Sequence, residues 1–157
     1  MLKEDDVAPD FTLLNQKGED VSLSELKGKW TVLYFYPKDN TPGCTIEAID
    51  FTASKKEFEQ LGAVVLGISP DSVKSHAGFC EKKSLTITLL SDESKDVLKK
   101  YGVWDKKKFM GREYIGVIRS TFLIDPKGNV VVVWSPVKVK GHVEEVLDQL
   151  KKRSKKI

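Results

Sequence analysis

Residues 30–36 of the chain are Trp30-Thr31-Val32-Leu33-Tyr34-Phe35-Tyr36, and Pro37 follows them directly. Every side chain in this run is aliphatic, aromatic or β-branched, and no alternation of polar and apolar positions interrupts it. Such a run is typical of a strand that is buried on both faces of a sheet. Pro37 lacks a backbone N–H and ends the strand. The run therefore predicts an α/β fold in which helices flank a central sheet.

Downstream of Pro37, helical and strand patterns alternate. Helical spacing predicts a helix over residues 44–61, closed by Gly62, and its apolar positions are Ile46, Ile49, Ala53, Phe58 and Leu61. A buried strand is predicted over 63–69. The start signals Pro70-Asp71-Ser72 then introduce a helix, whose apolar positions are Val73, Ala77 and Cys80. A short strand over 85–90 and a short helix over 95–101 follow.

Two hairpins and a last helix complete the pattern. Apolar runs at 120–125 and 130–134 flank the turn 126–129, and those at 11–14 and 20–23 flank a polar turn. Apolar residues at helical spacing within 143–150 indicate a final amphipathic helix. After the first hairpin the order is β–α–β–α–β–α–β–β–α. This order predicts one domain over 1–157: a thioredoxin-like fold with a central mixed sheet flanked by helices and an N-terminal β-hairpin extension.

Composition restricts the class of protein. The chain has 157 residues, of which 40% are hydrophobic and 31% charged, as in ordinary globular proteins. No apolar run approaches the ~20 residues of a membrane helix, and the first residues lack the apolar core of a signal peptide. We therefore expect a cytoplasmic protein with no membrane partner. Net charge is +3, and the basic block at 151–156 is interpreted as a solvated helix end, so we expect no nucleic-acid partner; the alternative is a contact for nucleic acid.

The loop 37–43 and the residue that follows it carry the candidate chemistry. Cys44 is predicted in the first turn of a helix, directly after the carboxyl end of a buried strand. Unpaired N–H groups and the positive end of the helix dipole favour a thiolate, so we expect a pKa below the free value of about 8.5. Pro42 holds Thr41 in an extended conformation, which could aim the Thr41 hydroxyl at the sulfur of Cys44. The alternative is an ordinary loop with Cys44 as a small buried hydrophobe.

The loop resembles a known family. Pro37-x-x-x-Thr41-x-x-Cys44 matches the peroxidatic signature of peroxiredoxins, and the string 34–45 with the segment 119–125 is similar to the bacterioferritin comigratory protein branch, also called PrxQ. The resemblance implies a hydroperoxide substrate, a peroxidatic Cys44, a pocket lined by Thr41 and Arg119, and shielding by Pro37. A fixed guanidinium suits this chemistry because it can bind both thiolate and peroxide oxygens.

Other roles remain open for two of the polar residues near this site. From the sequence alone, Arg119 could equally be a surface salt-bridge partner. Glu47 could orient Arg119, or it could simply supply a suitable charge at a helix start.

The second cysteine decides the subtype. Many members of the branch carry a resolving cysteine five residues after the first, but this chain has Ile49 there. The resemblance implies that Cys80 is the resolving residue, because a second group in the branch keeps its thiol at such a position. The expected product is an intramolecular disulfide formed after local unfolding, in a monomer, and reopened by thioredoxin or a similar dithiol protein. The alternative is a one-cysteine enzyme in which Cys80 is a core thiol.

Three other functions are compatible with parts of the sequence. A general dithiol oxidoreductase is disfavoured because Cys44 has no partner three residues on. A redox-sensing or holdase module would use the fold without turnover, and a nucleic-acid-binding protein would use the C-terminal lysines. His76 and His142 have no ligand spacing with either thiol, so we predict no metal and no organic cofactor.

Overall fold

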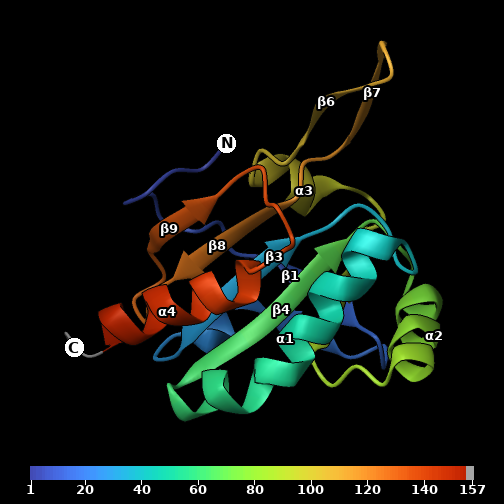
Figure 1. The fold of residues 1–157 in the computed structure, drawn as a ribbon. Coiled ribbons are helices and arrows are strands. Elements are labelled where there is room, and N and C mark those ends of the chain that lie inside the picture. Colours follow the sequence, from blue (N-terminus) through green and yellow to red (C-terminus); the bar gives the residue numbers. More distant parts are fainter. Residues whose placement is uncertain (155–157) are drawn as a thin grey trace.

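The computed structural model describes residues 1–154 and is built on a seven-stranded sheet (Figure 1). The strand order is β2-β1-β5-β4-β3-β8-β9. The bounds of its strands are β1 Thr12–Asn15, β2 Asp20–Ser22, β3 Trp30–Phe35, β4 Ala63–Ser69, β5 Thr88–Ser91, β8 Ser120–Ile124 and β9 Val130–Trp134. The predicted mixed sheet with an N-terminal hairpin is confirmed.

Strand β3 is central, as the run 30–36 predicts. All six of its residues are buried. It pairs in parallel with β4 and antiparallel with β8, so that Phe35 lies beside Ile68 on one side and Ser120 on the other. Because β3 and β8 run in opposite directions, the carboxyl end of β3 and the start of β8 meet at one edge of the sheet.

Helices cover both faces of the sheet (Figure 1). They are α1 Pro42–Gln60, α2 Val73–Lys83, α3 Asp96–Lys100, α4 His142–Ser154 and the short 3-10 helix η1 Leu23–Leu26. Side chains of α1, α2 and α4 share one hydrophobic cluster with the sheet, and those of α3 and the N-terminal segment share the other. The sheet therefore separates two cores, and both cysteines belong to the first.

The predicted apolar faces of the first two helices are only partly confirmed: Phe58 is buried and Leu61 and Cys80 pack against the core, but other predicted positions are exposed. On α1, Ile46 and Ile49 are 53% and 43% exposed, whereas the buried positions are Cys44, Glu47, Ala48, Phe51 and Phe58. On α2, Ala77 is exposed, and the buried positions are His76 and Phe79. In both helices a polar side chain lies on the buried face, which disguises the apolar stripe that a sequence pattern relies on.

One hairpin was not predicted. Strands β6 Trp104–Phe109 and β7 Arg112–Val117 pair antiparallel and project from the body of the protein (Figure 1). Their tip has positive φ at Met110 and Gly111 (52° and 78°), the pattern of a two-residue hairpin turn. Most side chains of this ribbon are exposed on both faces. Polar and apolar residues therefore do not alternate, and the sequence lacks the usual strand signal.

The C-terminal helix α4 ends in basic residues that contact acidic neighbours. Lys151 lies 3.6 Å from Glu57, and Lys152 lies 3.2 Å from Asp148. These contacts are typical of a solvated helix end. The last two residues of the basic block, 155 and 156, lie outside the described residues. Within residues 1–154, no helix combines the length and the apolar character that a bilayer crossing requires.

Candidate active site

Cys44 lies in the first turn of α1, where the sequence predicts it. Thr41 is the N-cap residue, and Pro42 occupies the first turn, where its missing N–H costs no helical hydrogen bond. Thr41 provides no side-chain cap, so the N–H groups of the first turn point out of the helix without that partner. The Cys44 side chain is 1% exposed, and the thiol is free. The sulfur is therefore enclosed next to backbone donors.

Arg119 connects this sulfur to a buried carboxylate. It lies between β7 and β8, and its Nη2 donates a hydrogen bond to Cys44 Sγ at 3.3 Å. Its Nη1 donates to Glu47 Oε1 at 2.7 Å. Glu47 follows Cys44 by three residues, so both side chains lie on the same face of α1. The structure thus places the Arg119 guanidinium between Glu47 and the sulfur of Cys44, in contact with both, and the catalytic role of this arrangement stays a prediction.

Gly43 allows this close approach. A Cβ atom at Gly43 would lie 3.2 Å from Arg119 Nη2, closer than most side-chain contacts. Any larger residue would therefore press on the guanidinium that contacts the sulfur.

Burial shifts the pKa values of Glu47 and Arg119. It raises the pKa of Glu47 to about 7, against the opposing effect of Arg119, and Asp50 adds to the increase. Glu47 Oε2 is buried without a hydrogen-bond partner among the described residues, which explains why one ion pair does not offset the loss of water. Burial alone would lower the pKa of Arg119, but Glu47 and Cys44 raise it above its ordinary value. The guanidinium therefore stays charged.

Glu47→Gln is expected to remove a pH-dependent cost to stability. The folded pKa of about 7 exceeds the ordinary 4.5, so the folded state binds more protons between these values, and the free energy of unfolding falls as pH rises. The variant has no carboxyl group to titrate and therefore lacks this decrease in the free energy of unfolding, which is on the order of 3 kcal/mol. Burial lowers the pKa of His142 to about 4, so this residue makes the free energy of unfolding rise with pH. Its contribution is the same in the variant and in the unaltered chain and cancels when the two are compared.

Urea unfolding at pH 4.5 and 7.5 measures this difference. The unfolding free energy of Glu47→Gln, relative to the unaltered chain, should increase with pH. A constant difference across that range would mean that folding does not raise the pKa of Glu47.

The Thr41 hydroxyl does not point its proton at the sulfur. Its Oγ1 donates to the Lys38 carbonyl at 2.7 Å, because the loop turns between these residues and brings that carbonyl close. The expected donation to Cys44 is therefore absent from this state of the loop. Pro37 follows β3 and is half-buried; its shielding role stays a prediction.

Lys107 is a cation near the site that the sequence analysis missed. It comes from the unpredicted hairpin, and its Nζ donates to the Val117 carbonyl at 2.7 Å. Burial and the charge of Arg119 lower its pKa, while Cys44 acts in the opposite direction. In the sequence it is one of three consecutive lysines, and nothing distinguishes it from its exposed neighbours.

Cys80 is a free, half-buried thiol on α2. Burial raises its pKa to about 11, and Asp39 adds to the increase. In this state the thiol is protonated at neutral pH. It packs at the margin of the cluster that contains Cys44. Ala77, which the sequence places on the same face, is exposed, but the contact of Cys80 with the core is compatible with either a resolving or a structural thiol.

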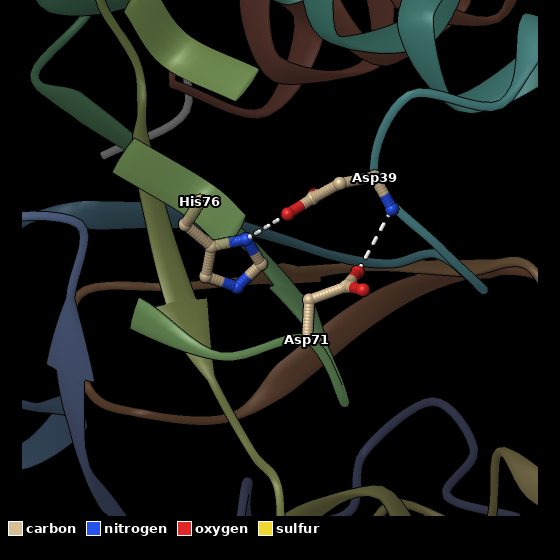
Figure 2. A group of neighbouring side chains, drawn as sticks. All are labelled: Asp39, Asp71 and His76. Atoms are coloured by element: carbon tan, nitrogen blue, oxygen red, sulfur yellow. Dashed lines mark hydrogen bonds and ion pairs between the residues drawn. The ribbon is translucent and has the colours of Figure 1, made fainter. Parts of the chain in front are cut away.

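A polar cluster lies between the Cys44 loop and α2. Ligand atoms of Asp39, Asp71 and His76 lie within 4.8 Å of one another (Figure 2), close enough to share a metal ion. Each already has protein partners: Asp71 Oδ2 accepts from the Asp39 backbone N–H at 2.8 Å, and His76 Nδ1 lies 2.7 Å from Asp39 Oδ2. His76 Nε2 faces the Leu90 carbonyl at 2.9 Å. A metal would have to displace these bonds, so we interpret the group as a hydrogen-bonded cluster.

A free cysteine in the first turn of a helix, in contact with an arginine and at the edge of a mixed sheet, is an arrangement typical of thiol-dependent oxidoreductases. A model described as the AhpC/TSA family matches residues 5–133. Peroxiredoxin Bcp of Bacillus subtilis is 51% identical over 149 residues, 95% of each chain, and Peroxiredoxin Bcp of Escherichia coli is 42% identical over 153 residues, 98% of each.

Solved structures agree with these relatives. Xanthomonas campestris peroxiredoxin Q has a TM-score of 0.88 and 44% identity, over 92% of this chain and 91% of that one. The Xylella fastidiosa PrxQ mutant has a TM-score of 0.89 and 40% identity, over 97% and 99%. The chain belongs to the AhpC/TSA family, in its Bcp/PrxQ branch of peroxiredoxins. The predicted thioredoxin-like fold and the predicted peroxidase class are confirmed.

Proposed function

We propose that this peroxiredoxin reduces hydrogen peroxide and organic hydroperoxides by an atypical two-cysteine mechanism. The thiolate of Cys44 attacks one peroxide oxygen, the O–O bond breaks, and Cys44 becomes a sulfenic acid while the other oxygen leaves as hydroxide or alkoxide and takes a proton. The Cys80 thiol then displaces water from the sulfenic acid and forms an intramolecular disulfide. A thioredoxin or similar dithiol protein reduces this disulfide by exchange and is itself oxidised.

The single observation that carries the first step is the Arg119 guanidinium, which donates to Cys44 Sγ and is held by Glu47. A fixed cation at the sulfur stabilises negative charge there, and its remaining N–H groups can bind the departing oxygen. The first-turn N–H groups of α1 supply further donors. Thr41 and Pro37 complete the proposed pocket, in which Thr41 can accept a hydrogen bond from the substrate.

Solved structures from Xanthomonas campestris support the finer steps. A structural study of the Xanthomonas campestris bacterioferritin comigratory protein, 42% identical, concerns its alkyl peroxide reduction activity. Structures of X. campestris peroxiredoxin Q include serine variants of two cysteines that lie 36 positions apart. Cys44 and Cys80 have the same separation. We therefore extend to this chain a substrate range that includes alkyl hydroperoxides, and a resolving role for Cys80.

An intramolecular disulfide requires local rearrangement. Bonded cysteines have Cα atoms about 4.4–6.8 Å apart, whereas both thiols are free here and sit on separate helices. The first turn of α1 and part of α2 must loosen, which costs less than global unfolding. One chain contains both sulfurs, so a monomer suffices. We place the reaction in the cytoplasm, where dithiol reductants are maintained.

Cys80→Ser is expected to allow one turnover and then stop. Cys44 still reaches the sulfenic acid, but no thiol in the chain can displace its oxygen, and thioredoxin has no disulfide to reduce. Peroxide consumption should equal about one molecule per chain and then fall to background, because the catalytic cycle is interrupted after its first step. An assay with thioredoxin, its reductase and NADPH measures this directly.

Ala77→Ser is the matched control, since it changes an exposed position on the same helix and should cycle normally. Peptide mapping of the peroxide-treated unaltered chain should find residues 44 and 80 cross-linked. Full thioredoxin-driven cycling by Cys80→Ser would establish the one-cysteine mechanism instead.

A further inference from the structure

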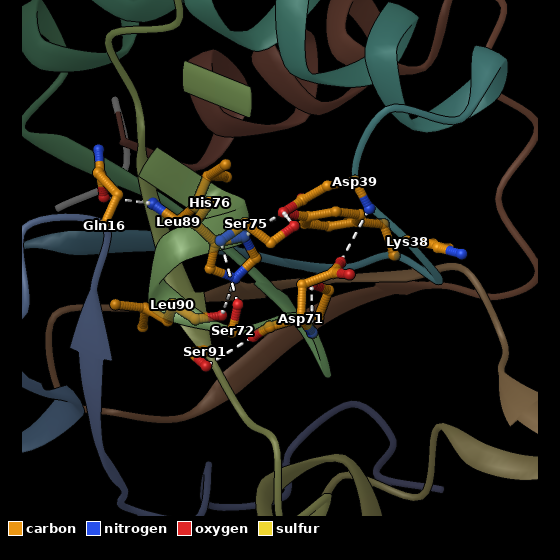
Figure 3. Close-up of polar contacts among 12 residues, drawn as sticks. Gln16, Lys38, Asp39, Asp71, Ser72, Ser75, His76, Leu89, Leu90 and Ser91 are labelled. Carbon is orange, nitrogen blue, oxygen red and sulfur yellow. Dashed lines mark hydrogen bonds and ion pairs between the residues drawn. The ribbon is translucent and has the colours of Figure 1, made fainter. Parts of the chain in front are cut away.

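Asp39 is buried in the loop that leads to Cys44, and its carboxyl group makes three side-chain hydrogen bonds. Asp39 is 4% exposed. Its Oδ1 accepts from Tyr36 Oη at 2.6 Å. Its Oδ2 accepts from Ser75 Oγ at 2.8 Å and lies 2.7 Å from His76 Nδ1 (Figure 3). A buried carboxylate with three partners is well satisfied, so this loop residue has a defined position.

Asp39 is also held through its backbone. Its N–H donates to Asp71 Oδ2 at 2.8 Å, and the same oxygen accepts from Ser69 Oγ at 2.7 Å. Asp71 directly precedes Ser72, the N-cap of α2, and Ser75 and His76 lie in the first turn of that helix. Asp39, in the loop that leads to Cys44, thus makes hydrogen bonds to three residues at the start of the helix that carries Cys80: Asp71, Ser75 and His76.

The geometry defines how His76 takes part. His76 is completely buried, and its Nε2 lies 2.9 Å from the Leu90 carbonyl, which can only accept. Nε2 therefore carries a hydrogen. One further proton is shared between Nδ1 and Asp39 Oδ2, 2.7 Å apart. With that proton on the ring the contact is a buried ion pair, and with it on the carboxyl group it is a neutral hydrogen bond.

We propose that Asp39, Asp71, Ser75 and His76 form a latch that joins the Cys44 loop to the Cys80 helix in the reduced enzyme and sets how readily the two separate for disulfide formation. The proposal rests on the resolving role of Cys80. Asp39 precedes Cys44 by five residues, and His76 precedes Cys80 by four, one turn of α2. These are positioning residues, because they act on the thiols through the segments that carry them.

The latch has a chemical consequence. While it is closed, Cys44 stays in its pocket beside Arg119, and Cys80 is protonated and half-buried near Asp39. Opening the latch frees both segments and removes Asp39 from Cys80. The closed state favours attack on peroxide, and the open state favours the disulfide. Its stability therefore determines how long the sulfenic acid persists and is at risk of further oxidation to sulfinic acid.

Ser75→Ala tests the latch with little disturbance, since it removes one donor to Asp39 and leaves the imidazole in place. Rapid acid quenching and mass spectrometry follow sulfenic acid and disulfide separately. Loss of one hydrogen bond to a charged group should favour the open state and speed disulfide formation about tenfold. Oxidation of Cys44 should change less than about twofold, and the peroxide concentration that gives half sulfinic acid should rise about tenfold.

Three further variants separate the latch from general destabilisation. Ser75→Thr keeps a hydroxyl and should return the disulfide rate toward that of the unaltered chain. Asp39→Asn removes the charge and should also speed the disulfide step. Ala77→Ser, exposed on the same helix, should change nothing. A purely structural role would lower the melting temperature of Ser75→Ala and Asp39→Asn without this selective effect on one step.

Hydrogen exchange in the reduced protein tests the latch without any cysteine chemistry. Peptides covering 38–47 and 73–80 should exchange faster together in Ser75→Ala and Asp39→Asn. If the unaltered chain forms no disulfide between residues 44 and 80, the proposed function fails, and the coupled exchange alone decides the latch. If the disulfide forms but both its rate and the exchange in these variants match Ala77→Ser, the latch is refuted.

Discussion

Cys44→Ser is expected to reduce peroxide consumption to the uncatalysed background. In the proposed mechanism the attacking group is the Cys44 sulfur, to which Arg119 donates a hydrogen bond, and a serine hydroxyl at the same place is a far weaker nucleophile than a thiolate. No other thiol can take over, because the remaining cysteine, Cys80, has a pKa raised to about 11 by burial and by Asp39. Stopped-flow measurement of peroxide with the reduced protein gives the result.

The matched control for this variant is Cys80→Ser, which should retain the first turnover at an almost unchanged rate. Both variants should unfold at similar temperatures, because each exchanges a sulfur for an oxygen of similar shape. Peroxide consumption by Cys44→Ser at a rate comparable with that of the unaltered chain would place the peroxidatic centre elsewhere.

Arg119→Ala is expected to slow oxidation of Cys44 about 10²–10³-fold, the typical cost of removing a fixed donor at a developing negative charge. The variant loses the hydrogen bond to Sγ at 3.3 Å and leaves Glu47 buried without its cation. Arg119→Lys should recover only part of the rate, because an ammonium group cannot contact both Glu47 and the sulfur with a planar fork. The second-order rate constant with hydrogen peroxide is the measurement.

Arg112→Ala provides the control, since Arg112 is exposed on the nearby hairpin strand β7. It should react at the rate of the unaltered chain. A change of less than about threefold in Arg119→Ala, in a variant that remains folded, would contradict the role given to the guanidinium.

The sequence predicts the framework of the protein because the signals involved are local. The apolar run 30–36 identifies the central strand, and Pro37 together with the start of α1 places Cys44 at a helix N-terminus. The Pro37-Thr41-Cys44 spacing further identifies the family. Each of these depends on residues that are neighbours in the chain, whose effects on backbone conformation are known in advance.

The predictions that failed concern the buried faces of helices α1 and α2 and the hairpin β6–β7. Glu47 and His76 occupy buried positions on α1 and α2, so the true inward faces do not look apolar in the sequence. The hairpin β6–β7 extends away from the cores, so no burial pattern marks its strands. A hydrophobic pattern marks a helix face clearly only when every buried position is apolar, and a strand only when at least one of its sides is buried. The buried faces of α1 and α2 each include a polar side chain, and most side chains of the hairpin are exposed on both faces.

By itself, the amino-acid sequence determined the α/β order, the family and the position of Cys44 at a helix start, because all three follow from local conformation and from the spacing of nearby residues. Only the tertiary structure decided what surrounds the sulfur. Arg119 reaches Cys44 across 75 residues of sequence, and His76 reaches Asp39 across 37. Such contacts depend on which strands pair and which helix faces turn inward, and these follow from the packing of the whole chain.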